Sequence, residues 1–221
     1  MSDNISVVFP VLIRDTKQLS MTMKCLELAK KNTALPFELI IVETASQYLV
    51  DEGDIYVYEK EITTPEKSHN RGFRMANSSF IGLLTNDVFV SEGWLECLVD
   101  CFNSRKDCGA ATLASTQFGH TKENKIEEGN WWSVALLRRE IFESVGYYDE
   151  RFVNCWCDTD LLVRMYKQGW KMYRNFNCVV DHLVGQTNYA KPGFQENYVQ
   201  GRQLFRDKHE GCGLEIYEAT K

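Results

Sequence analysis

Residues 80–88 read FIGLLTNDV, an apolar run that is followed at once by three polar residues. Residues 80–84 are short, uncharged and bounded by a polar turn, which predicts a buried strand of a parallel sheet. Open α/β sheets bind their ligands at the carboxyl ends of such strands. We therefore expect Thr85, Asn86 and Asp87 to lie at the edge of the sheet where a ligand binds.

Segments before this stretch alternate between two kinds of pattern. Residues 5–13 (ISVVFPVLI) form an apolar, β-branched run that predicts a buried strand. Residues 20–31 carry apolar side chains at helical spacing and end in two lysines, which suit the last turn of a helix. The other elements predicted here are strands at 37–42 and 55–58 and a helix at 69–77. This alternation predicts a mostly parallel sheet with helices on both faces.

The carboxyl-terminal half continues the α/β pattern with more helices. An amphipathic helix is predicted at 158–168, where Leu161, Leu162 and Met165 share one face and Gly169 ends the helix. The other predicted elements are helices at 94–102, 138–145 and 195–209 and strands at 109–115 and 171–180. No repeat or low-complexity linker interrupts the chain. We expect a single-domain, Rossmann-like α/β fold over residues 1–221, with a mixed, mostly parallel sheet.

The composition argues against several classes of protein. The 221 residues carry a formal net charge of -6, whereas broad contact with a phosphate backbone needs a basic face. No segment reaches the roughly 20 apolar residues of a membrane-spanning helix, and the amino terminus lacks a secretory pattern. The eight cysteines are scattered without a CxxC pair, which favours reduced thiols. We expect a soluble, cytoplasmic protein with no nucleic-acid or membrane partner.

Three polar residues follow predicted strands, namely Glu43, Asp87 and His182. A carboxylate and an imidazole at two strand ends can share a divalent ion, and oxygen ligands favour Mg²⁺ or Mn²⁺. Each residue alone also fits a plainer interpretation, because an acid after a strand is more often a helix cap or a turn residue. The order of motifs along the chain favours the functional interpretation.

The chain resembles the family 2 glycosyltransferases of the GT-A fold over nearly its whole length. In the amino-terminal half the matching stretches are VVFP (7–10), LIIVETAS (39–46), HNRG (69–72) and LLTNDV (83–88). The family's metal motif is Asp-x-Asp, and here Thr85 replaces its first aspartate while Asp87 retains its last. The resemblance implies that the nucleotide-sugar is bound by Pro10, Glu43, Ser46, Asn70, Arg71, Asn86 and Asp87.

The carboxyl-terminal half resembles the acceptor and catalytic region of the same family. Its matching stretches are WSVALLRREIFESVGYYDE (132–150), CDTDLLVR (157–164), VDH (180–182) and GQT (185–187). The resemblance implies that Asp158 is the general base, that His182 joins Asp87 as a metal ligand, and that residues 185–187 cover the diphosphate. The residues that it assigns to the acceptor are Trp132, Asp149, Glu150 and Asp160.

The family membership implied here carries a reaction with it. A sugar would pass with inversion from a nucleoside-diphosphate donor, a UDP-sugar being favoured, to a hydroxyl of a carbohydrate or another acceptor, with Mn²⁺ or Mg²⁺ assisting. Residues 1–90 would form the donor-binding half, residues 91–187 the acceptor and catalytic half, and residues 188–221 a helical tail. A second subunit could complete the small acceptor region, so a homo-oligomer is possible.

Other interpretations of these residues remain open. Asp158 could simply cap the helix that follows it, Asp160 could pair with Arg164 at i,i+4 spacing, and Trp132 could belong to the core. The histidines without an evident partner in the sequence are His69, His120 and His209.

Two other functions compete with transfer. A sugar-phosphate nucleotidyltransferase would carry a glycine- and basic-rich loop near its start, and residues 9–14 contain no glycine. A catalytically reduced nucleotide- or sugar-binding module is compatible with the changes at Thr85 and at Cys157, which replaces the family's usual glutamate.

Overall fold

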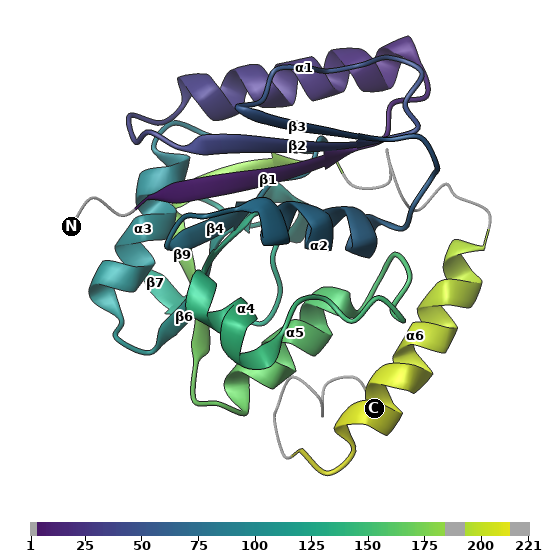
Figure 1. The fold of residues 1–221 in the computed structure, drawn as a ribbon. Coiled ribbons are helices and arrows are strands. Elements are labelled where there is room, and N and C mark those ends of the chain that lie inside the picture. Colours follow the sequence, from purple (N-terminus) through teal and green to yellow (C-terminus); the bar gives the residue numbers. More distant parts are fainter. Residues whose placement is uncertain (1–3, 184–192, 213–221) are drawn as a thin grey trace.

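The computed structural model describes residues 4–183 and 193–212, which form a nine-stranded sheet with helices on both faces (Figure 1). The strands are β1 (Ile5–Val11), β2 (Glu38–Thr44), β3 (Ile55–Glu59), β4 (Phe80–Leu83), β5 (Val88–Phe89), β6 (Cys108–Ser115), β7 (Ile126–Glu128), β8 (Ala135–Arg138) and β9 (Lys171–His182). The helices are α1 (Thr16–Lys31), α2 (Pro65–Met75), α3 (Trp94–Ser104), α4 (Arg139–Val145), α5 (Cys157–Tyr166) and α6 (Phe194–His209).

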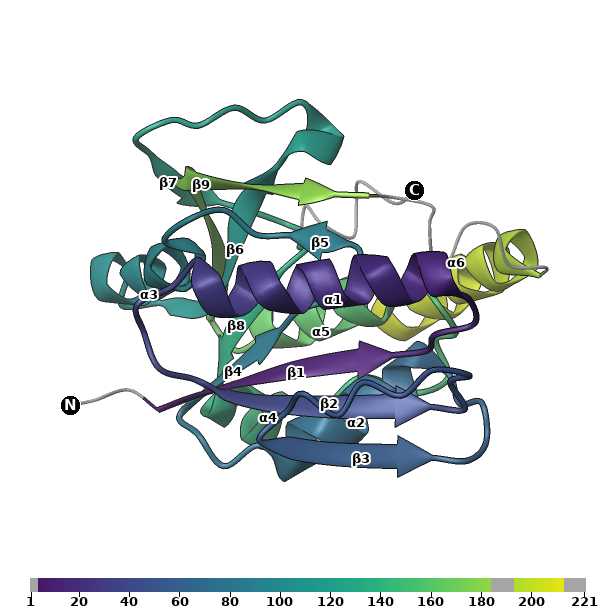
Figure 2. The same cartoon turned by 90° about the horizontal axis from the view of Figure 1, so that it is seen from above.

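The sheet is mixed and mostly parallel, as predicted. Its strands follow the order β3-β2-β1-β4-β8-β6-β9-β5, and β7 pairs with β9. The four strands from β3 to β4 are mutually parallel, and so are β6 and β9, while β8 runs antiparallel between β4 and β6. In Figure 2 the arrowheads of β1, β2, β3 and β9 point toward the side on which α6 lies. The carboxyl ends of these strands therefore meet at one edge.

Two hydrophobic cores lie on opposite faces of this sheet. One core packs β1 and β2 against α1 and α3 and buries Val7 and Trp94, and the other packs them against α2, α4 and α5 and buries Val8 and Phe73. Neighbouring residues such as Val7 and Val8 serve different cores because side chains alternate between the faces of a strand. A small third cluster joins α5 to α6 and contains Phe205. Burial on both faces explains why the strands are continuous apolar runs.

The predicted helices and strands are confirmed, with some of their ends shifted. α1 begins four residues earlier than predicted because the Asp15 carboxylate accepts a hydrogen bond from the Gln18 amide at 2.8 Å and caps the helix. α2 also begins earlier, at Pro65, since proline suits the first turn, where its missing N–H has no partner in any case. The sequence does not predict β5, β7 or β8 as strands. β5 and β7 have two and three residues and are too short to show a period.

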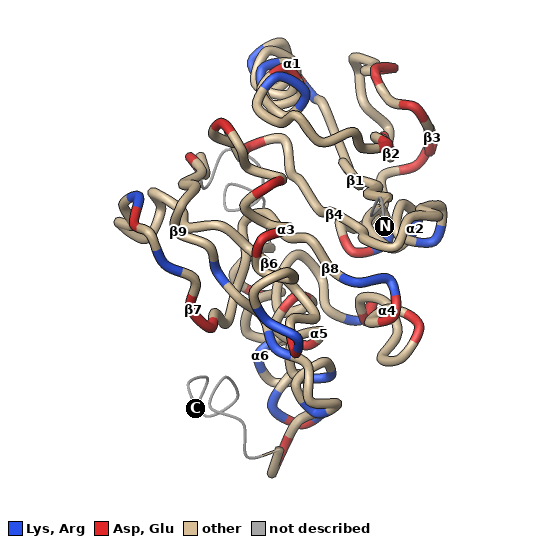
Figure 3. Tube along the Cα trace, turned by 90° about the vertical axis from the view of Figure 1, so that its left-hand side faces the viewer, with Lys and Arg blue, Asp and Glu red and all other residues tan. Residues whose placement is uncertain are grey.

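Three further observations bear on the class of protein. Among the described residues no helix is long and apolar enough to cross a membrane. All eight cysteines are described, and all are free. Lys and Arg are interspersed with Asp and Glu along the described trace (Figure 3).

Candidate functional site

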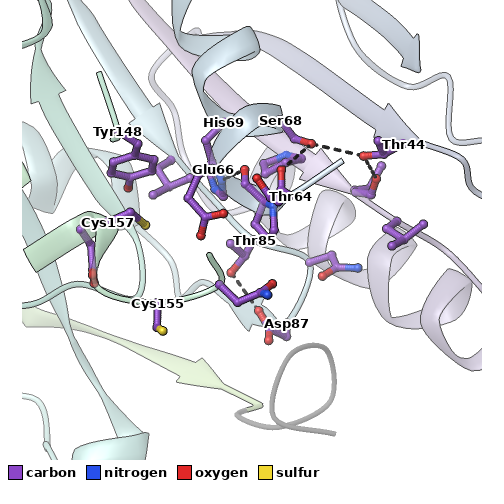
Figure 4. A pocket seen from close by; sticks show the side chains of 18 of the residues that line it. Thr44, Thr64, Glu66, Ser68, His69, Thr85, Asp87, Tyr148, Cys155 and Cys157 are labelled. Atoms are coloured by element: carbon purple, nitrogen blue, oxygen red, sulfur yellow. Dashed lines mark hydrogen bonds between the residues drawn. The ribbon is translucent and has the colours of Figure 1, made fainter. Parts of the chain in front are cut away.

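A cavity of about 530 Å³ lies at the edge of the sheet where the parallel strands end. Its walls come from segments far apart in the sequence: the end of β1, Thr44 of β2, the turn after β4, the first turns of α2 and α5, the end of β9 and the start of α6. Figure 4 shows side chains from several of these segments around one common space. This is the edge at which open α/β sheets bind ligands.

Six of the predicted site residues line this cavity. They are Pro10, Asn86, Asp87, Trp132, Asp158 and His182. Trp132 also packs into the core with residues of α2 and α5, and its contact with an acceptor stays a prediction. The predicted loop at 185–187 lies outside the described residues.

Asp87 and His182 lie side by side on one wall. β5 pairs Val88 with His182, and the Leu183 amide donates a hydrogen bond to the Asp87 carbonyl at 2.8 Å, so the end of β9 is fixed beside the turn after β4. The His182 Nε2 atom lies 3.7 Å from the Asp87 Oδ2 atom. The Thr85 hydroxyl donates to the Asp87 Oδ1 atom at 2.8 Å. Thr85 therefore orients the Asp87 carboxylate.

A carboxylate and an imidazole this close together are groups that can hold a divalent ion. Within the described residues, no three or more His, Cys, Asp or Glu side chains gather as a metal site. Mg²⁺ is usually held by one or two protein groups together with phosphate oxygens and water, so a complete protein cage is not required. The carboxylate of Asp87 and the imidazole of His182 are close enough for both to reach one ion. The pair thus suits a metal that binds together with a nucleoside diphosphate.

Asp158 faces the cavity from the first turn of α5. Its Oδ1 atom accepts hydrogen bonds from the Thr159 amide at 2.8 Å and from the Thr159 hydroxyl at 3.4 Å. Burial raises the pKa of Asp158, and the hydrogen bond from the Thr159 amide acts in the opposite direction. A carboxylate with a raised pKa takes up a proton more readily at neutral pH than an ordinary aspartate does. The local environment therefore suits a general base.

An aromatic wall stands beside Asp158 and includes residues of α6. The Trp156 indole N–H donates to the Tyr198 carbonyl at 3.0 Å, and the two rings lie 5.3 Å apart. Gly201 permits this contact, since a Cβ atom at that position would lie 2.7 Å from the Trp156 ring. Phe194 lines the same cavity. α6 therefore belongs to the site, whereas the sequence predicts it only as a helical tail.

The first turn of α2 brings polar residues into the cavity that the sequence does not single out. Glu66 and His69 both line the cavity and are only 2% and 9% exposed. Burial raises the pKa of Glu66 and lowers that of His69 to about 4. Because the predicted helix starts at residue 69, its first turn is missed. The signal that could have found it is Pro65 after Thr64, a typical helix start.

Glu43 and Ser46 are buried and are not among the residues that line the cavity. The Glu43 carboxylate accepts a hydrogen bond from the Tyr56 hydroxyl at 2.7 Å, and the Ser46 hydroxyl accepts one from the Ile13 amide at 2.8 Å. Thr44 is the residue of β2 that lines the cavity, because successive side chains of a strand point to opposite faces. Contact of Glu43 and Ser46 with a nucleotide stays a prediction.

Asn70 and Arg71 connect α2 to neighbouring segments. The Asn70 side-chain amide donates to the Tyr148 carbonyl and to the Glu150 carboxylate, both at 2.9 Å, and its oxygen accepts from the Tyr148 amide at 3.0 Å. Arg71 forms an ion pair with Glu59 at 3.2 Å. Neither residue lines the cavity. Asn70 fixes the position of the loop that contains Tyr148, and Tyr148 does line the cavity. A direct contact of Asn70, Arg71 or Glu150 with a substrate stays a prediction.

Asp149 and Asp160 bind α6. The Lys208 ammonium lies 2.7 Å from a carboxylate oxygen of each, and the His209 Nε2 atom lies 2.9 Å from the Asp160 Oδ1 atom. Arg164 pairs with Asp160 at 2.8 Å, which confirms the i,i+4 pairing considered from the sequence. Burial opposes ionisation of Asp160, but the hydrogen bond from His209 and the charge of Arg164 keep its pKa below the usual range. His209 therefore has a partner that the sequence does not reveal, and an acceptor role for the two aspartates stays a prediction.

Comparisons with known proteins agree with this architecture. Residues 6–153, more than half of the chain, match the model of glycosyl transferase family 2. A segment of 62 residues is 45% identical to the O-antigen biosynthesis protein RfbC of Myxococcus xanthus. This segment makes up 26% of the present chain and 4% of RfbC. The chain thus spans only a small part of that relative.

Three solved structures are similar over nearly the whole chain. GalNAc-T7 with UDP, GalNAc and Mn²⁺ has a TM-score of 0.71 at 13% identity, covering 91% of this chain and 48% of that one. TarS 1-349 of S. aureus has a TM-score of 0.70 at 11% identity, with 98% and 68% covered. The mannosyltransferase PcManGT from Pyrobaculum calidifontis, in complex with GDP-Man and Mn²⁺, has a TM-score of 0.70 at 12% identity. That match covers 99% of this chain and 68% of PcManGT. At such identities the likeness establishes the fold, which is of the expected GT-A type. Because residues 6–153 match the model of glycosyl transferase family 2, this chain belongs to that family.

Proposed function

We propose that this protein transfers a sugar from a nucleoside-diphosphate donor to an acceptor hydroxyl, with inversion at the anomeric carbon. The observation that carries the proposal is that one cavity holds Asp87 and His182, which can reach one ion, together with Asp158, a carboxyl group of raised pKa. Structures with the same fold are described with UDP or with GDP-Man, in both cases with Mn²⁺. A UDP-sugar is the favoured donor.

The chemistry assigned to the chain's own residues is a single displacement. The acceptor oxygen forms a bond to the anomeric carbon while the bond from that carbon to the phosphate oxygen breaks. Asp158 takes the proton of the attacking hydroxyl, and the nucleoside diphosphate leaves with the electron pair of the broken bond. A positioned base of this kind contributes about 10²- to 10⁴-fold in rate.

Asp87 and His182 are the residues that would hold a divalent ion, and the hydrogen bond from Thr85 fixes the orientation of the Asp87 carboxylate. When bound, Mn²⁺ or Mg²⁺ supplies positive charge that stabilises the departing diphosphate. The aromatic wall of Trp156, Tyr198 and Phe194 borders Asp158 and is therefore the expected side for the acceptor.

The proposal is tested by ligand binding across donor classes. Thermal unfolding and calorimetry are followed with UDP-, GDP-, dTDP- and CMP-sugars, each with and without Mn²⁺. One nucleotide class should stabilise the protein only when Mn²⁺ is present, and Asp87→Asn should remove that metal dependence. If no nucleotide-sugar stabilises the wild-type protein under either condition, the donor assignment is wrong.

A further inference from the structure

The cavity contains buried polar atoms that the chemistry proposed for Asp87 and Asp158 does not use. Among the described residues, the Oε2 atom of Glu66, the Nε2 atom of His69 and the Oγ atom of Ser133 are buried and have no hydrogen-bond partner. All three residues line the cavity, and each is at least nine-tenths buried. Buried polar atoms in native proteins almost always have a partner, so this cluster of exceptions marks a place in the cavity where a ligand group can supply the missing partners.

The two strongest of these groups are hydrogen-bond acceptors. The His69 Nδ1 atom lies 2.6 Å from the Pro65 carbonyl oxygen, which can only accept, so Nδ1 carries the proton. In the neutral ring Nε2 then has a free lone pair and accepts. The Glu66 side chain also accepts in its ionised form. A ligand group that satisfies these acceptors must therefore donate hydrogen bonds. A hydroxyl group can do so, whereas a diphosphate has only acceptor oxygens and cannot.

These acceptors are held in fixed positions. The His69 ring packs against Phe73 and Tyr148, with ring centroids 5.9 Å and 5.7 Å away. Asn70, the next residue of α2, is hydrogen-bonded to both backbone groups of Tyr148. In Figure 4 Glu66 projects into the middle of the cavity, between Tyr148 and Cys157 on one side and Thr85 and Asp87 on the other. It thus lies between the helix that carries Asp158 and the predicted metal site.

We propose that Glu66 and His69 form a specificity subsite that reads hydroxyl groups of the transferred sugar. The proposal rests on the proposed function, because it places the sugar of the donor between the predicted metal site and the base. The first turn of α2 would thereby determine which donor sugars are accepted. Discrimination against a sugar that lacks one of the contacted hydroxyls should be strong, because the buried acceptors would then remain unpaired.

The test compares donors that differ at one hydroxyl. UDP-glucose, UDP-N-acetylglucosamine, UDP-galactose and GDP-mannose are assayed first, and the best donor is then supplied in its monodeoxy and deoxyfluoro forms. For the wild type, kcat/KM should be at least about 100-fold lower with the deoxy and the deoxyfluoro analogue of one particular hydroxyl than with the parent donor. Neither hydrogen nor fluorine can donate the hydrogen bond that this hydroxyl donates. Glu66→Met, which keeps the side-chain shape without an acceptor, should reduce that discrimination to less than about tenfold.

Controls separate this subsite from a structural effect. Glu66→Gln keeps one acceptor oxygen and should restore part of the discrimination, whereas Glu143→Met, at an exposed position of α4, should leave it at the wild-type value. Affinity for UDP or GDP without a sugar should be the same in the wild type and in Glu66→Met. If Glu66→Met proves unstable, His69→Asn, which can still donate to the Pro65 carbonyl but lacks Nε2, is assayed in its place and should weaken the discrimination in the same way.

Three results would overturn the proposal. The first is a Glu66→Met protein that discriminates among the deoxy donors as the wild type does. The second is an equal loss of affinity for the free nucleotide, which would assign the subsite to the nucleobase. The third is a wild-type protein that turns over no donor at all, which refutes the proposed function itself and is distinguished from the others because it appears before any variant is made.

Discussion

Trp156 has a φ of 71°, which places a bulky aromatic residue in the left-handed region of the backbone. Such a conformation costs about 1–3 kcal/mol and persists only where the surroundings enforce it. Here the contacts of the Trp156 ring with Tyr198 and Phe205 hold it. The chain then enters α5 with Asp158 facing the cavity. Strain immediately before a buried carboxylate is typical of a functional site.

Replacement of Asp158 by asparagine should abolish transfer and leave donor binding intact. The amide has nearly the same shape but cannot take the proton of the acceptor, so kcat should fall by about 10²- to 10⁴-fold. Steady-state kinetics give kcat, and calorimetry gives the affinity for the nucleotide-sugar. Thr159→Ser, which keeps the hydroxyl beside Asp158, is the matched control and should remain active. Near-normal turnover of Asp158→Asn would remove this residue from the mechanism.

The pH dependence of the rate should report the raised pKa of Asp158. The base acts only when deprotonated, so activity is lost as the pH falls through its pKa, and burial moves that loss to a higher pH than for an ordinary aspartate. Glu66 and Cys157 also face this region, but neither a carboxyl group nor a thiol can carry the positive charge that would lower the pKa of Asp158. A profile of kcat that stays flat down to about pH 4, the ordinary range for aspartate, would contradict the assignment.

At the scale of elements, α6 is attached to the rest of the protein by a buried ionic cluster. Asp160→Asn removes the negative charge that Arg164, Lys208 and His209 share. Breaking a buried cluster in this way should lower the free energy of unfolding by about 3–5 kcal/mol, as urea titration would measure. Glu128→Gln breaks an exposed pair with Lys171 and should cost less than about 1 kcal/mol. Equal effects of the two changes would show that the cluster contributes little.

The contact between α2 and β1 depends on a glycine. A Cβ atom at Gly72 would lie 2.3 Å from the Val8 Cγ1 atom, so Gly72→Ala should overpack this interface and destabilise the protein by about 1–3 kcal/mol. At Gly82 of β4 the nearest atom would be 3.2 Å away, so Gly82→Ala should cost less. Thermal unfolding of the two variants tests the difference. A Gly72→Ala protein as stable as the wild type would mean that α2 shifts freely on the sheet.

At the scale of the molecule, the architecture could largely be predicted because its signals are local. Apolar runs such as residues 5–13 and the periodicity of 158–168 depend only on neighbouring residues. β5 could not be predicted, because a two-residue strand exists only through its pairing with β9. That missed strand is what brings His182 to Asp87, so the resemblance to a family supplied a contact that periodicity could not.

The site could be predicted in part, for a related reason. Residues at strand ends and in family motifs, such as Asp87 and Asp158, were identifiable from their place in the sequence. Glu66 is a cavity residue because the tertiary structure brings the first turn of α2 and residues 154–157, far apart in the sequence, around the same cavity, a relation that no local pattern encodes. Asp158 and Asp160 are both aspartates and are two positions apart on α5. Asp158 lines the cavity, whereas Asp160 points toward α6, because residues two positions apart on a helix point in different directions. Tertiary packing, more than residue type, selects the members of the site.

Release of nucleoside diphosphate from nucleotide-sugars tests the proposed transfer most directly. The wild type, Asp87→Asn and Asp158→Asn are incubated with UDP-N-acetylglucosamine, UDP-glucose and GDP-mannose, with and without Mn²⁺. We predict that the wild type releases nucleoside diphosphate from one donor class, that this release depends on Mn²⁺, and that it is at least about 100-fold slower in Asp158→Asn. Donor that binds to the wild type with Mn²⁺ but is never cleaved, or cleavage at equal rates by all three proteins, would contradict it.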